Sequence, residues 1–500
     1  MRSAICLLLV GLLVATGCNR AEEARRQRQK AEEQLRQVSD RLKETEQQEV
    51  SQESEFVHRI TTEVEYYTGG PQQGRPADGT FAADTRVALL EEAGSYTLVR
   101  SESGVEGYVA ADAVAGPGII RMDVVEIVEG GNQFAFDLYQ RLRSGESNLF
   151  FSPSSISVAL AMTYAGAEGE TATEMAETLH FPLADEDLHD RMQAMQEFCT
   201  TPIKNRGIQL HLANRLWGQQ GYEFLPEFLR ITRENYGAEL APLDFNLTEE
   251  SRQTINLWVE EQTQQKIVDV IPSGALVSDT KLVLTNAVYL KGDWNQPFDE
   301  ERTEDEDFHL TDRETVTAPL MHQQEEFRYA AVDGLQILEL PYGDETLSMI
   351  VLLPDAIDGL ADLETQLMPE TVDQWMDRLK TEEVKVYLPK FEMSSQFDLS
   401  GTLSSMGMES AFDDTQADFS DMTGGRDLFI SAVLHKAFVD VNEEGTEAAA
   451  ATAVIMEPTA APFEEPKEPP VFRADHPFVF LIRDNRNDAI LFLGRVVNPS

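Results

Sequence analysis

The segment from Glu443 to Pro477 constrains the fold of this 500-residue chain more than any other stretch. It opens with two acids, a glycine and a threonine, runs through four consecutive alanines, and ends in sequence rich in acids and proline. Read with a period of two, one face carries Thr446, Ala448, Ala450, Thr452, Val454 and Met456, and the other face carries Glu447 and Glu457. Such a segment can become a strand inside a sheet without burying a charge. Alanine also favours a helix. The alternative to an inserted strand is a solvated, alanine-rich linker.

Apolar runs with high β-propensity lie on both sides of this segment. LFISAVLHKAFVDVN precedes it, at residues 428–442. After Pro470, two further runs flank Asp484 to Asp488, which predicts a C-terminal hairpin. A long loop is therefore expected between strands that are buried.

These residues resemble a known family. HKAFVDVNEEGTEAAAAT, followed by HPFVFLIRD and FLGRVVNP, closely resembles the reactive-loop hinge and C-terminal strands of the serpins. The resemblance continues upstream through NLFFSPSSISVALAMTYAGAEGET (148–171), ANRLW (213–217), INLWVEEQTQQKIVDVI (from 255), LVLTNAVYLKGDW (ending at 294) and LPKF (388–391). It implies an α+β serpin domain over residues 122–500, with three β-sheets, surrounding helices and an exposed reactive loop.

The resemblance further implies a suicide-type inhibitor of serine proteases. In that mechanism a protease cleaves the loop and forms an acyl-enzyme, and the part of the loop before the cut inserts as a new central strand that traps the protease. The period-two pattern meets the physical requirement for such an insertion. Two alternatives stay open: a serpin that binds or chaperones without inhibiting, and a structural lipoprotein that binds the cell wall.

Roles for individual residues follow from the resemblance. The hinge consists of Glu443, Glu444, Gly445, Thr446, Ala448, Ala449, Ala450 and Ala451. Lys390 and Glu443 are expected to form an ion pair where the loop enters the sheet, at the breach, with Trp294 nearby. A polar cluster beneath the sheet, the shutter, comprises Ser152, Ser155, Asn286 and His435.

Counting from the hinge places the reactive bond between Thr459 and Ala460. Counting back from Pro469 and Pro470 places it near Pro466 and Lys467 instead, and the hinge count is preferred because the inserting strand must match its neighbours in length. Threonine before the bond favours an elastase-like target. Phe463 and Lys467 keep chymotrypsin-like and trypsin-like proteases open, and a cysteine protease is a further alternative.

Composition excludes several function classes. A formal charge of −48 argues against binding nucleic acid. The chain has no phosphate-binding glycine loop, H-E-x-x-H motif, paired-cysteine metal site or nucleophile elbow. Its histidines at 322, 435 and 476 are isolated in sequence, so we expect no enzyme, no cofactor and no metal site.

The N-terminus resembles a bacterial lipoprotein. Residues 1–17 form a charged start and a short apolar core, and Cys18 follows as the predicted site of lipidation. Residues 18–55 contain no proline or glycine and carry a weak heptad pattern, which predicts a helical or coiled-coil stalk. A single exposed helix or a charged flexible tether is the alternative. The expected location is the cell envelope, on the periplasmic or extracellular face of a bacterial membrane.

Residues 56–118 change to short β-rich runs separated by glycine. Thr80 to Val114 resembles the bacterial Src-homology-3-like barrels, which often bind cell-wall peptides, so peptidoglycan is a candidate partner. A passive spacer barrel is the alternative.

Within the large domain, Phe134, Leu138 and Leu142 have helical spacing. A second helix is expected over Val158 and Met162, with Ser155 as its cap. KLVLTNAVYL (281–290) and LSMIVLLP (347–354) are apolar enough to be central strands.

Overall fold

The computed structural model describes residues 58–60, 64–68, 70, 77–82, 85–93, 96–101, 104–110, 113–115, 120–145, 147–182, 187–200, 208–238, 240–343, 345–446 and 468–500. The predicted leader, Cys18, the stalk, the alanines at 448–451 and the Thr459–Ala460 bond lie outside this part. The chain divides into two compact units, Met1–Ile119 and Ile120–Ser500. Among the described residues, no helix combines the length and the apolar character that a bilayer-spanning segment needs.

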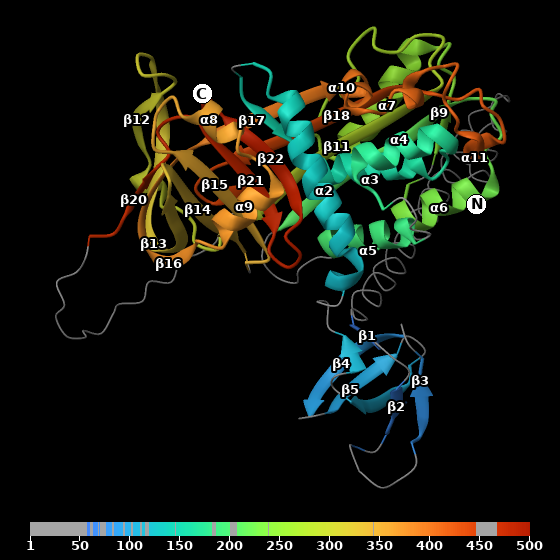
Figure 1. The fold of residues 1–500 in the computed structure, drawn as a ribbon, viewed down its shortest axis with the longest axis horizontal. Coiled ribbons are helices and arrows are strands. Elements are labelled where there is room, and N and C mark those ends of the chain that lie inside the picture. Colours follow the sequence, from blue (N-terminus) through green and yellow to red (C-terminus); the bar gives the residue numbers. More distant parts are fainter. Residues whose placement is uncertain are drawn as a thin grey trace, which may run out of the picture. The chain divides into compact units, whose positions relative to one another are not determined.

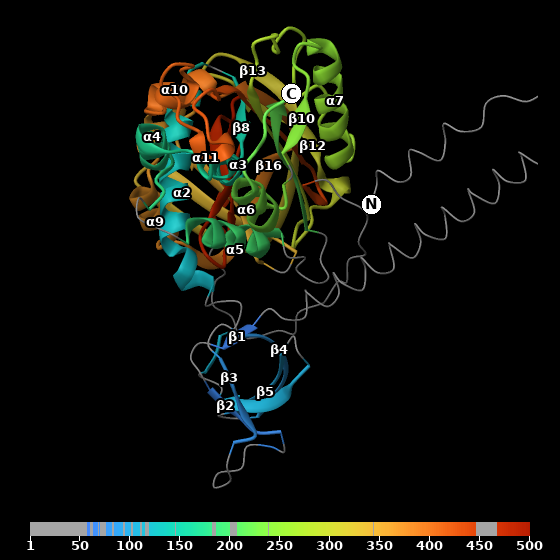
Figure 2. The same cartoon turned by 90° about the vertical axis from the view of Figure 1, so that its right-hand side faces the viewer.

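The first unit is built of short strands around a small core (Figure 2). Five strands form an antiparallel sheet in the order β6 (Glu106–Ala110), β5 (Tyr96–Ser101), β4 (Arg86–Ala93), β1 (His58–Ile60) and β7 (Val114–Ala115). A second pair comprises β2 (Val64–Tyr66) and β3 (Gly79–Phe81). Tyr66 stacks on Phe81, and a Cβ at Gly79 or Gly107 would lie 2.6 Å from Tyr66 side-chain atoms. The close approach of this ring therefore requires the two glycines.

The described strands of the second unit connect into two sheets (Figure 1), because one long strand joins two of the three predicted groups of strands. The six-stranded sheet has the order β10 (Ala241–Leu243), β9 (Gln209–Gln219), β11 (Leu282–Asp293), β19 (Gly445–Thr446), β18 (Ile430–Val441) and β17 (Phe391–Asp398). The nine-stranded sheet runs β20 (Val471–Arg473), β16 (Lys380–Pro389), β13 (Thr315–Val332), β14 (Leu335–Tyr342), β15 (Leu347–Pro354), β21 (Phe478–Asp484), β22 (Ile490–Val496) and β8 (Leu149–Phe151), with β12 (Glu304–His309) paired to β13. The long β13 joins the strands β12 and β16 to the strand β14. Its residues 315–320 pair with β12, residues 320–329 pair with β16, and residues 328–332 pair with β14.

Helices lie mostly toward the six-stranded sheet, on the right of the unit in Figure 1. They are α2 (Ile120–Leu142), α3 (Pro153–Tyr164), α4 (Gly169–Leu179), α5 (Leu188–Thr200), α6 (Pro226–Tyr236), α7 (Thr248–Gln262), α8 (Leu360–Glu364), α9 (Pro369–Met376), α10 (Ser400–Met406) and α11 (Ser420–Thr423). The short 3-10 helices are η4 (Glu300–Arg302) and η5 (Ser410–Phe412). The predicted α+β class is confirmed.

Both faces of the six-stranded sheet are buried at its centre, along β11 and β18. Leu284 and Val288 of β11 belong to the main core, together with residues of α2, α3 and the nine-stranded sheet. Val283 and Ala287 belong to a second core that includes Ile255 of α7. Because side chains alternate along a strand, a strand added to this sheet meets one core on each face.

Several sequence predictions can be compared directly with these elements. The runs at 281–290 and 347–354 become the interior strands β11 and β15, and the C-terminal runs become the β21–β22 hairpin, as predicted. The cap predicted at Ser155 is wrong, because α3 begins at Pro153 and Ser152 is its N-cap. Proline at the first helical position has no amide hydrogen to lose, so the residue before it takes the capping role.

Candidate functional site: the turn at residues 442–446 and the sheet beneath it

The two central strands of the six-stranded sheet are parallel and part at one end. β11 and β18 pair directly from Leu282 to Tyr289 of β11. Beyond this point the chain leaves β18, turns at residues 442–445, and returns as β19 between the two strands. Thr446 lies opposite both Gly292 and Val441, and it runs antiparallel to each of their strands. The start of the predicted hinge is therefore already a strand of the sheet.

Gly445 makes this return possible. Its φ is 152°, and a Cβ there would lie 2.1 Å from the carbonyl oxygen of Gly292. Backbone hydrogen bonds between Asn442 and Gly445 run in both directions and close the turn. Only glycine fits both the conformation and the space.

Thr446 is fully buried at the point where the sheet opens. Its Oγ1 lies 2.8 Å from the phenolic oxygen of Tyr342, which is itself fully buried. Burial raises the pKa of Tyr342, so the phenol keeps its proton. The ring of Trp294 stacks on Tyr342 with 4.5 Å between centroids, and its Nε1 donates to the carbonyl oxygen of Asn442. The turn and the first inward residue are thus held by two aromatic side chains.

Glu443 is fixed by an ion pair. Its Oε2 lies 2.7 Å from Nζ of Lys390, its Oε1 accepts a hydrogen bond from Thr303 at 2.7 Å, and its side chain is only 6% exposed. Burial by itself raises the pKa of Glu443, but the hydrogen bonds from Lys390 and Thr303 outweigh it and hold the pKa below its ordinary value. Glu443 therefore stays ionised where the chain leaves β18.

The four residues predicted for the cluster beneath the sheet meet in space. Asn286 of β11 and His435 of β18 are cross-strand partners, and Nδ1 of His435 contacts Oδ1 of Asn286. Asn286 Nδ2 donates to the carbonyl oxygen of Ser155, 3.0 Å away. The backbone N–H of Ser152 donates to Nε2 of His435 at 3.2 Å. The two central strands are thus joined to each other and to the N-terminus of α3.

The hydrogen bonds fix the tautomer of His435. Nε2 accepts from Ser152, so the ring hydrogen must lie on Nδ1, where it donates to Asn286. Burial lowers the pKa of His435 to about 3. The ring is neutral at physiological pH, which makes it a structural connector and not a general base.

Sequence reasoning missed three members of these groups. Asn214 of β9 contacts the side-chain amide of Asn286, Thr303 bonds Glu443, and Tyr342 bonds Thr446. Asn214 lies inside the ANRLW segment. A polar residue in an apolar strand indicates a buried polar partner, so the sequence could have marked Asn214. Thr303 and Tyr342 come from distant elements and carry no local signal.

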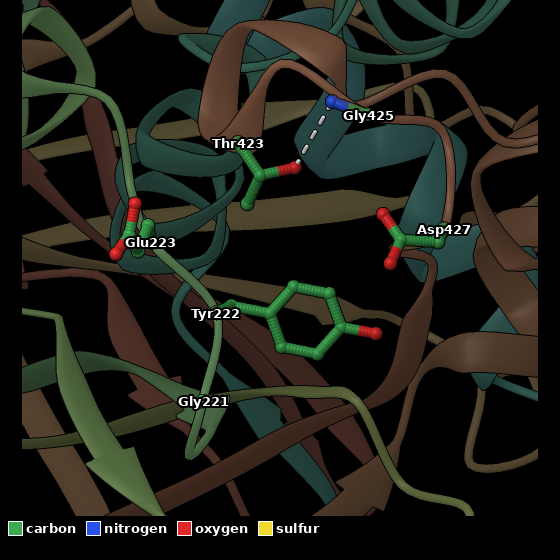
Figure 3. A pocket seen from close by; sticks show the side chains of 6 residues that line it. All are labelled: Gly221, Tyr222, Glu223, Thr423, Gly425 and Asp427. Carbon is green, nitrogen blue, oxygen red and sulfur yellow. Dashed lines mark hydrogen bonds between the residues drawn. The ribbon is translucent and has the colours of Figure 1, made fainter.

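A polar pocket lies elsewhere in this unit, between the turn at 221–223 and residues 423–427 (Figure 3). The ring of Tyr222 points toward Asp427, and Gly425 N donates to Thr423 Oγ1 at 3.4 Å. Burial and then Asp427 raise the pKa of Tyr222. The six lining residues include two carboxylates, Glu223 and Asp427, and the phenol of Tyr222.

Known proteins resemble the large unit closely. The family model described as Serpin (serine protease inhibitor) matches residues 129–499. The human leukocyte elastase inhibitor is 43% identical over 387 residues, which cover 75% of this chain and 100% of that protein. Its counterpart from Xenopus laevis is 44% identical over 378 residues, covering 73% of this chain and 97% of the relative. Both are vertebrate proteins, so they give no support to a bacterial source.

Solved structures agree. Uncleaved ovalbumin is similar with a TM-score of 0.67 and 32% identity, covering 75% of this chain and 100% of its own. Serpin48 of the insect Tenebrio molitor is similar with a TM-score of 0.66 and 32% identity, covering 75% of this chain and 98% of its own. The predicted serpin fold is confirmed. On the family match and on these identities, the chain belongs to the serpin family of serine protease inhibitors.

Proposed function

We propose that this chain inhibits a serine protease by cleavage of its reactive loop and insertion of the loop into the six-stranded sheet. As a serpin it is an inhibitor and not an enzyme. The proposal rests on the position of β19, which already lies between β11 and β18 and is antiparallel to both. Residues that follow Thr446 can extend this strand without a change of direction.

The register of β19 supports insertion in detail. Thr446 pairs with Gly292, so continuing the antiparallel register assigns Ala448 to Leu290 and Ala450 to Val288. In the same register Met456 would pair with Leu282, where β11 begins. Leu282, Leu284, Val288 and Leu290 all belong to the main core, so the small and apolar loop residues would face that core. This is the face that the period-two pattern keeps free of charge.

The acids of the loop meet lysines in this register. Glu447 is assigned to Lys291 and Glu457 to Lys281 on the opposite face. Each pair would place opposite charges directly across two strands, which stabilises a sheet by roughly 0.2–1 kcal/mol. The extended register thus supports a role for the hinge from Glu443 to Ala451 and for the breach and shutter residues around it.

We further propose that the protease cuts between Thr459 and Ala460. This bond lies three residues beyond Met456, so a strand that fills the length of β11 uses all but the last three residues of the segment before the cut. Relatives of the chain are named leukocyte elastase inhibitors, and threonine suits the small pocket of an elastase-like protease. An elastase-like serine protease is therefore the first target to test.

The test is to incubate the chain with elastase-like, chymotrypsin-like and trypsin-like proteases and to analyse the products on denaturing gels and by mass spectrometry. We expect a covalent complex with an elastase-like protease, whose mass is the summed mass of the two proteins less that of a released fragment that begins at Ala460. A protein that is cleaved by every protease while each protease stays fully active would instead be a non-inhibitory serpin.

For the N-terminal region we propose a lipid anchor at Cys18, a stalk over residues 18–55 and a Src-homology-3-like barrel over residues 56–118. This arrangement would hold the inhibitor at the face of a cell envelope. The leader sequence and the glycine-dependent packing around Tyr66 support it. Detergent-phase partitioning that is lost in Cys18→Ala tests the anchor, and a peptidoglycan pull-down that is lost on deletion of 56–118 tests the barrel.

A further inference from the structure

Two glutamates of β12 and a histidine of β13 meet on one face of the nine-stranded sheet. Glu304 and Glu306 are two residues apart on β12, so their side chains share a face. Glu304 pairs with Leu320 of β13, and His322 lies two residues further along β13 on the same face. One ligand atom from each of the three side chains lies within 4.8 Å of the other two.

His322 supplies an independent indication of a ligand. Its Nε2 is buried and has no hydrogen-bond partner among the described residues. The ring is held by stacking on Tyr387 of β16, with 5.1 Å between centroids. A buried imidazole nitrogen without a partner is unfavourable, because the atom has lost water and gained nothing in exchange. A cation bound at Nε2 would satisfy it.

We propose that Glu304, Glu306 and His322 form a binding site for a divalent transition-metal cation of the Zn²⁺ class. One imidazole and two carboxylates are ligands that Zn²⁺ accepts, and three protein ligands leave a position for water. Zn²⁺ bonds to nitrogen and carboxylate oxygen are about 2.0–2.2 Å long. Ligand atoms of a tetrahedral ion lie about 3.3–3.6 Å apart at these bond lengths. Atoms that lie within 4.8 Å of one another therefore need to approach by about 1.5 Å or less, and Glu304 is exposed.

Arg473 contacts one of the three proposed ligands. Its Nη2 contacts Oε2 of Glu306, and its guanidinium also lies over the ring of Tyr387. Arg473 keeps a second partner, because its Nε donates to Asp475 at 3.0 Å. A cation can therefore take Glu306 without leaving Arg473 unpaired. Arg473 ends β20, the strand that follows the reactive loop, so the site lies beside the C-terminal attachment of that loop.

The test is calorimetric titration of the full chain with ZnCl₂, together with the visible absorption of bound Co²⁺. We expect one equivalent of Zn²⁺ that is lost, or bound at least tenfold more weakly, in His322→Gln and in Glu304→Gln. The second variant changes an exposed residue, so its folding is not at risk. With Co²⁺ bound, the visible spectrum of the wild type should show the d–d bands of a four- or five-coordinate ion. These bands should be absent from the spectrum of His322→Gln with Co²⁺.

Matched controls come from the same two strands. His309→Gln on β12 and Glu325→Gln on β13 change residues of the opposite strand faces and should leave the titration unchanged. Unchanged Zn²⁺ binding and Co²⁺ spectra in both His322→Gln and Glu304→Gln would overturn the proposal. Loss of the same equivalent in either control would also overturn it, because the ion would then bind elsewhere.

Discussion

The hydroxyl of Tyr342 and the hydroxyl of Thr446 lie 2.8 Å apart at the point where the two central strands of the sheet separate. Tyr342 ends β14 in the nine-stranded sheet, and Thr446 ends β19 in the six-stranded sheet, so this contact joins the two sheets at the start of the reactive loop. The first inward residue of the hinge is therefore inserted before any cleavage. What remains for insertion is the segment from Glu447 onward.

Thr446→Arg should convert the inhibitor into a substrate. A guanidinium at this position has to enter a fully buried space beside Tyr342, and burying an unpaired charge costs several kcal/mol. The loop is then cleaved but inserts too slowly to trap the acyl-enzyme. The stoichiometry of inhibition, measured by titrating a fixed amount of protease, should rise at least tenfold. Thr446→Ser, which keeps a small side chain and its hydroxyl, is the control, and an unchanged stoichiometry in Thr446→Arg would refute an inserting strand.

Tyr342→Phe should weaken the attachment of the hinge while keeping the ring stack with Trp294. The lost hydrogen bond to Thr446 is worth about 1 kcal/mol. We expect faster amide hydrogen exchange at residues 445–446 and a slightly lower urea midpoint. Tyr387→Phe, which leaves the hinge untouched, should not change exchange at these residues. Equal exchange in wild type and Tyr342→Phe would show that the contact does not hold the hinge.

Lys291→Glu should slow loop insertion by about two- to fivefold. The extended register places Lys291 opposite Glu447, and reversing its charge replaces an attraction with a repulsion of roughly 0.2–1 kcal/mol. The double change Lys291→Glu with Glu447→Lys should restore the rate, measured by stopped-flow fluorescence of a labelled loop. Failure of the second change to restore the rate would place the inserted strand in a different register.

Stability should depend on pH through His435. Its folded-state pKa is about 3, well below its ordinary value of 6.5, because burial opposes the charged ring. The unfolded chain thus binds this proton first, and stability falls as the pH drops from about 6.5 toward 3 by about 1.4 kcal/mol per pH unit. In His435→Gln, urea midpoints between pH 4.5 and 6.5 should lose that part of the slope. An identical slope in both proteins would mean that the ring is not buried in its neutral form.

Local sequence pattern predicted the strands well. The runs that became β11, β15, β18, β21 and β22 are apolar on both faces, and such runs have few outcomes other than buried strands. The breach and shutter pairs were placed through family resemblance, and the chain does bring Lys390 to Glu443 and Asn286 to His435. The alternation of small and acidic residues after Thr446 could be recognised without any related protein, because it follows from the two-residue period of a strand.

Contacts between distant elements could not be predicted in the same way. Tyr342 and Thr303 reach the hinge from other strands and loops, and nothing in their neighbourhoods marks them. Glu304, Glu306 and His322 form no metal-binding motif in sequence, since the β12–β13 pairing creates their proximity. The sequence does not distinguish Ser155 from Ser152 as the helix cap, because the choice depends on where Pro153 starts the helix.

The most direct test of the central claim is the melting temperature of the chain before and after cleavage within residues 447–467. Insertion adds a strand that buries apolar side chains on the main core, and each kcal/mol gained raises the melting temperature of a large domain by about 2–4 °C or less. We predict a rise of more than about 10 °C for the cleaved full chain, and no such rise for Thr446→Arg cleaved at the same bond. A cleaved wild type that melts at the temperature of the intact protein would contradict insertion between β11 and β18.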